Sequence, residues 1–78
     1  MERRIFEIAR DIQKEWGDKV YFGAKPYLEA MLFLSTPKDK YGFDSASEIV
    51  NYFLANASTF RGDNAKKLKS ELKEILKG

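Results

Sequence analysis

Two segments of this chain are almost free of charge, although 33% of its 78 residues are Asp, Glu, Lys or Arg. Between positions 25 and 38 the only charged residue is Glu29, and from 45 to 59 the only one is Glu48. Apolar residues recur in both segments with the 3.6-residue period of an α-helix. Helices this apolar need neighbours on several sides, so the sequence predicts two central helices.

Proline and a capping pattern set the expected bounds of these two helices. Pro26 lacks an N–H, and the first turn of a helix needs none, so we expect a helix over residues 24–35. Ser45 and Glu48 match the capping box, in which each side chain bonds the other residue's backbone N–H. This pattern predicts the second apolar helix over residues 45–58.

Two amphipathic helices are expected to flank the apolar pair. Over residues 2–16, apolar side chains share one arc and charged side chains occupy the other. Over residues 64–77, a leucine-rich stripe lies beside a row of lysines, and Asp63 is placed to cap the N-terminus. Short connectors favour antiparallel neighbours. We therefore predict an all-α fold, a compact, mostly antiparallel four-helix bundle forming a single domain over residues 1–78.

Missing residue types narrow the chemistry that this chain can perform. It contains neither Cys nor His, which excludes disulfides, zinc sites built on those ligands, and nucleophiles activated by His. Glu29 stands alone in an apolar helix, where burial would raise its pKa and suit it to acid–base work. No second catalytic group accompanies it, so we expect no enzyme, no cofactor and no metal site.

The N-terminal residues "MERRIFEIARD" mix acidic and basic side chains and contain no apolar core of a signal peptide. No apolar run approaches the roughly 20 residues needed to span a bilayer. The sequence therefore predicts a cytoplasmic protein with no membrane association.

Aromatic residues gather at the expected connectors, which is typical of either end closure or partner binding. Phe33 also points away from the main apolar arc of its helix. We expect five residues to be candidates for contacting a protein partner or a second copy of the chain: Tyr21, Lys25, Phe33, Tyr41 and Arg61. We expect three other aromatic residues to close the ends of the bundle: Phe22, Phe43 and Phe60.

A row of lysines along the last helix gives an alternative function. Its members recur at spacings of three, four and four residues: Lys66, Lys69, Lys73 and Lys77. Such a row can follow a phosphate backbone and add salt-dependent, sequence-independent affinity for nucleic acid. The plainer interpretation is a solvated helix face, which the flanking Glu71 and Glu74 and the net charge of only +2 favour.

The stretches "YFGAKPYLEAM" and "YGFDSASEIVNYFLANASTFRGDNAKKLKSELK" resemble a family of small uncharacterised proteins from Gram-positive bacteria and their phages. The shared features are the tyrosine-glycine-aromatic-aspartate turn, the "YFLANAS" helix and the aromatic-basic-glycine connector, and they extend from Tyr21 to Leu72. The family has no assigned activity, so the resemblance implies only a small intracellular accessory protein of phage or mobile-element origin. We favour a non-enzymatic protein-interaction module whose partner the sequence does not identify.

Overall fold

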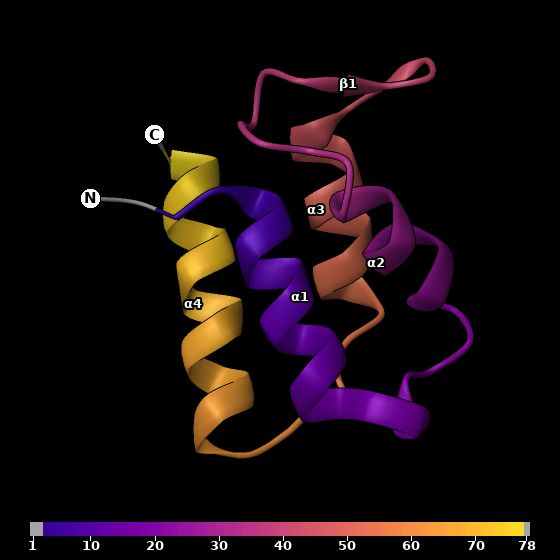
Figure 1. Cartoon of the computed structure of the whole chain (residues 1–78), viewed down its shortest axis with the longest axis vertical. Coiled ribbons are helices and arrows are strands. Elements are labelled where there is room, and N and C mark those ends of the chain that lie inside the picture. The colour runs from indigo at the N-terminus through magenta and orange to yellow at the C-terminus, as the bar shows by residue number, and fades with distance from the viewer. Residues whose placement is uncertain (1–2, 78) are drawn as a thin grey trace.

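The computed structural model describes residues 3–77, which form four α-helices, one short 3-10 helix and a two-stranded sheet (Figure 1). The elements in chain order are α1 (Ile5–Trp16), η1 (Gly17–Lys19), α2 (Lys25–Met31), β1 (Lys40–Tyr41), β2 (Asp44–Ser45), α3 (Ala46–Ala55) and α4 (Asp63–Lys77). The expected helix-rich fold is confirmed, but the chain is not purely helical. No helix within residues 3–77 has the length and apolarity that a membrane crossing requires.

The small sheet is a hairpin in a segment predicted to be only a connector between two helices. Lys40 pairs with Ser45 and Tyr41 with Asp44 in an antiparallel register. Gly42 has a φ of 67°, a left-handed conformation that glycine adopts without a steric penalty at a tight turn. Strands of two residues show no readable alternation of apolar and polar side chains, so the sequence pattern could not reveal them.

α2 ends at Met31, although the sequence predicted a helix to residue 35. Beyond it the chain winds more tightly, with the Phe33 N–H donating to the Ala30 carbonyl at 3.0 Å. This turn brings the Leu34 and Ser35 carbonyls to the N-terminus of α1. There they accept the first free N–H groups of that helix, from Phe6 (2.9 Å) and Ile5 (3.1 Å).

The other helix bounds differ from the predictions by a few residues. α1 begins at Ile5, and residue 2 lies outside the described range. α3 ends at Ala55 because the Asn56 side chain turns back and donates to the Tyr52 carbonyl at 2.8 Å. α4 already includes Asp63, so Asp63 occupies the first helical turn rather than the predicted cap position.

The predicted capping box at the start of α3 is confirmed. The Ser45 hydroxyl accepts a hydrogen bond from the Glu48 N–H (3.2 Å), and the Ser45 N–H donates to the Glu48 carboxylate (3.3 Å). Just before the hairpin, the Asp39 carboxylate accepts the backbone N–H groups of Ser35 (2.7 Å) and Thr36 (3.1 Å). These hydrogen bonds, that from Ser35 first, lower the pKa of Asp39.

The packing places α1 between α4 on one side and the α2–α3 pair on the other (Figure 1). α1 and α4 run in opposite directions, and α1 buries its whole apolar arc, from Ile5 to Trp16. The expectation that α2 and α3 are the central helices is therefore wrong. α3 leaves one aromatic side chain, that of Tyr52, 46% exposed.

The aromatic residues of the connectors differ in burial. Phe60 is buried, with its ring stacked on Trp16 at a centroid distance of 4.8 Å, so its expected role in closing the core is confirmed. The same expectation is wrong for Phe22 and Phe43, which are 79% and 105% exposed. Trp16 is covered by Phe60 and, edge-on, by Phe53.

Candidate partner-binding surfaces

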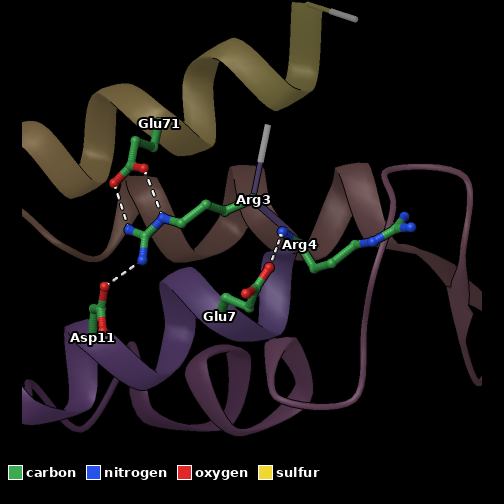
Figure 2. Close-up of polar contacts among 5 residues, drawn as sticks. All are labelled: Arg3, Arg4, Glu7, Asp11 and Glu71. Carbon is green, nitrogen blue, oxygen red and sulfur yellow. Dashed lines mark hydrogen bonds and ion pairs between the residues drawn. The ribbon is translucent and has the colours of Figure 1, made fainter. Parts of the chain in front are cut away.

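An arginine clasp joins the start of the chain to α4 (Figure 2). The Arg3 guanidinium donates two parallel hydrogen bonds to Glu71, from Nε at 2.9 Å and from Nη2 at 2.7 Å, and a third bond to Asp11 on α1. The hydrogen bonds that Arg3 donates to Glu71 first, and to Asp11 second, raise the pKa of Arg3. Next to the clasp, the Arg4 N–H donates to Glu7 and caps α1.

This clasp could not be predicted from the sequence, because Arg3 and Glu71 are 68 positions apart and no local pattern connects them. The clasp changes which charged residues of α4 are neighbours. Glu71 was expected to neutralise the neighbouring lysine row, but it faces α1 and is engaged by Arg3. The lysines on the other side of α4 therefore lose one of their two expected acidic neighbours.

The hairpin end of the molecule presents three exposed aromatic side chains, which we call the hairpin-end aromatics: Phe33, Tyr41 and Phe43. Phe33 follows α2 and is 77% exposed, with its ring 6.1 Å from that of the 46% exposed Tyr41 on β1. Phe43 lies in the turn of the hairpin and is fully exposed. Figure 1 shows this hairpin at one end of the molecule, beyond the start of α3.

The other predicted partner-binding residues lie elsewhere. Tyr21 contacts Phe22 at a ring-centroid distance of 4.8 Å in the connector before α2. Lys25, at the start of α2, lines a separate hollow of about 270 Å³ together with Asp18 and Glu29. The structure therefore brings Phe33 and Tyr41 together but does not bring Tyr21 or Lys25 to them.

Arg61, the fifth predicted residue, joins the lysine row instead. It lines a shallow depression of about 470 Å³ together with three lysines of α4, and we call these four cations and their surroundings the basic depression: Arg61, Lys66, Lys69 and Lys73, with Phe60, Gly62, Asp63 and Ser70. Lys77 does not line it and lies 3.6 Å from Glu74 in an exposed ion pair. Three of the four lysines that periodicity grouped therefore lie together, and Arg61, which the sequence also offered as a partner of this row, joins them, whereas Lys25 does not.

Lys69 is the least exposed of the four cations in the basic depression. Its Nζ lies 5.7 Å from the centroid of the Phe60 ring, a cation–π arrangement. Partial burial first, and the positive charges of Lys73 and Arg61 second, lower the pKa of Lys69. The side chains of this depression therefore repel one another, and an anion bound there would relieve the repulsion.

Other candidate chemistry finds no support in the geometry. Glu29 lies exposed on α2 and lacks the burial that acid–base work at this position would require. Within residues 3–77, no group of three or more potential metal ligands is arranged to hold an ion.

No protein-family model, curated protein or solved structure matches this chain. The resemblance to small proteins of Gram-positive bacteria and their phages therefore stays a prediction, and the surfaces described above carry the functional reasoning by themselves.

Proposed function

We propose that this helix-rich, bundle-like protein is a non-enzymatic interaction module that inserts its hairpin-end aromatics into an apolar pocket of a larger protein. The observation that carries the proposal is the exposure of Phe33, Tyr41 and Phe43. Side chains of this size and exposure present roughly 400–500 Å² of largely apolar surface to water. Exposed apolar surface of this extent on a small protein is often a binding site.

Phe43 is the strongest single contributor because it does nothing for the fold. A phenylalanine that is fully exposed at the tip of a hairpin gains no burial from folding. Burial of such a side chain in a partner's pocket is typical of the few residues that carry most of an interface's binding energy.

A larger partner fits this surface better than a second copy of the chain. If two copies met through their hairpin-end aromatics, they would together bury roughly 900 Å², less than the roughly 1,200 Å² of a stable specific interface. The pocket between α1 and α4 would also not accommodate the aromatic side chains of a second copy. It is lined mainly by charged side chains, among them Arg3, Asp11 and Glu71.

We also propose an intracellular accessory role of phage or mobile-element origin, which is what the resemblance to small proteins of Gram-positive bacteria and their phages implies. A bacterial or phage protein with an apolar cleft is the corresponding type of partner.

The proposal is tested with a double variant, Phe33→Ser with Phe43→Ser, and a matched control, Phe22→Ser. The control removes an aromatic side chain of similar exposure (79%) from another part of the surface. Tagged wild type and both variants are incubated with source-cell extract, and the captured proteins are quantified. A captured protein is then purified and titrated against all three chains by calorimetry.

We expect one protein to bind the wild type and the control equally and to bind the double variant at least tenfold more weakly. Equal binding to all three chains would exclude the hairpin-end aromatics as the site. Concentration-dependent dimerisation in analytical ultracentrifugation that the double variant abolishes would show that a second copy is the occupant, against the proposal.

A further inference from the structure

The basic depression concentrates more charge than the rest of the molecule. Its four cations face a single acid, Asp63, which gives a formal charge of +3. The whole chain carries +2, so the remaining residues sum to −1. The modest overall charge therefore conceals a local basic surface, which is the electrostatic feature that anionic macromolecules recognise.

The positive charges of this surface are not neutralised from within. Among residues 3–77, no ion pair within 4.0 Å engages Arg61, Lys66, Lys69 or Lys73. The two glutamates of α4 nearest to them in sequence are committed elsewhere, Glu71 to Arg3 and Glu74 to Lys77. These two glutamates were one support for the plainer interpretation of the lysine row, and neither of them pairs with the three lysines of the basic depression.

The lining of the basic depression favours double-stranded over single-stranded nucleic acid. Proteins that hold single strands without sequence preference stack bases on exposed aromatic rings. The only aromatic residue in the lining is Phe60, which is 4% exposed because Trp16 covers one face and Lys69 lies over the ring. The depression therefore offers charge to a phosphate backbone but no platform for a base.

We propose that the basic depression binds the phosphate backbone of double-stranded nucleic acid without sequence preference. Lys66 and Lys73 are seven residues apart on one helix, about 10 Å along its axis, which corresponds to about three base-pair steps along one strand. Arg61 extends this row beyond the N-terminus of α4. The site is independent of the hairpin-end aromatics, since the α3–α4 connector and the hairpin lie at opposite ends of the molecule (Figure 1).

The test is fluorescence anisotropy with a labelled 20-base-pair DNA duplex and with one of its single strands, at 50 and 200 mM NaCl. The site variant is Lys66→Glu with Lys73→Glu. The matched control is Lys19→Glu with Lys38→Glu, which makes the same change in net charge at exposed positions outside the depression. Circular dichroism of each variant verifies that the helices are intact.

We expect the wild type to bind the duplex, and binding to weaken roughly 40- to 150-fold between the two salt concentrations, the dependence for three to four phosphate contacts. The site variant should lose at least tenfold more affinity than the control. Three results would each overturn the proposal: no duplex binding at 50 mM NaCl, equal losses in the two variants, or tighter binding of the single strand than of the duplex.

Discussion

Phe60 and Phe43 provide the sharpest test of how this fold is held together, because both are connector phenylalanines with opposite burial. Phe60 is 4% exposed and stacks on Trp16, whereas Phe43 is fully exposed. We expect Phe60→Ala to destabilise the protein strongly and Phe43→Ala to leave its free energy of unfolding almost unchanged.

The magnitude for Phe60 follows from its surroundings. Replacing a buried phenylalanine by alanine removes transfer free energy and leaves a cavity, for a total of about 3–5 kcal/mol. Loss of the ring stack on Trp16 accounts for about 0.5–1.5 kcal/mol of that total. A chain of this size is expected to unfold with roughly 4–12 kcal/mol, so the variant should lose a large share of its stability. The corresponding fall in Tm is on the order of 20–30 °C.

Urea unfolding followed by circular dichroism and by the fluorescence of Trp16, the only tryptophan, measures both variants. Phe43→Ala should lie within about 0.5 kcal/mol of the wild type, as exposed substitutions usually do. If Phe60→Ala does not fold, Phe60→Leu keeps part of the apolar volume and should show a smaller loss in the same direction. A loss of free energy of unfolding below about 1 kcal/mol for Phe60→Ala would refute the assigned core. So would a loss for Phe43→Ala that exceeds the loss for Phe60→Ala.

Three further substitutions test individual polar contacts. Ser45→Ala removes the cap of α3 and should cost about 1 kcal/mol in urea unfolding, whereas Ser45→Asp should retain most of the stability. Asp39→Asn should destabilise the protein at pH 7, because the lowered pKa of Asp39 means that its ionised form stabilises the fold. That difference should vanish as pH falls below the ordinary value of 3.8 and then through the folded-state pKa, and a pH-independent difference would contradict it. Glu71→Gln weakens the clasp with Arg3 and should cost up to about 1 kcal/mol at low salt and less in 1 M NaCl, so a salt-independent loss would argue against an ionic contribution.

We expect the two proposed surfaces to bind their partners independently of each other. Variants of the hairpin-end aromatics should leave duplex binding unchanged, because the hairpin and the α3–α4 connector lie at opposite ends of the molecule (Figure 1). Charge reversal at Lys66 and Lys73 should likewise leave the binding of a protein partner unchanged. Anisotropy and calorimetry on both double variants check this independence, and a simultaneous loss of both activities would indicate a single shared site.

Much of the secondary structure could be predicted because it is encoded locally. The 3.6-residue period located all four helices, and the Ser45–Glu48 pair located the start of α3 within one residue. The hairpin was missed because its register depends on two residues in each strand and on the turn at Gly42. Periodicity also placed Lys66, Lys69 and Lys73 on one face, but it could not place Arg61 beside them, because a connector has no fixed geometry of its own.

The sequence by itself determined that the chain is rich in amphipathic helices and lacks Cys and His chemistry. It also showed more aromatic residues than a core of this size requires. Only the tertiary structure decided that Phe60 is buried while Phe43 is exposed, and that Glu71 belongs to Arg3 rather than to the lysines. The physical reason is the sequence separation of the residues that make each kind of contact. Helical periodicity and caps arise from contacts within one or two turns, whereas burial and ion pairing depend on residues brought together across the whole fold.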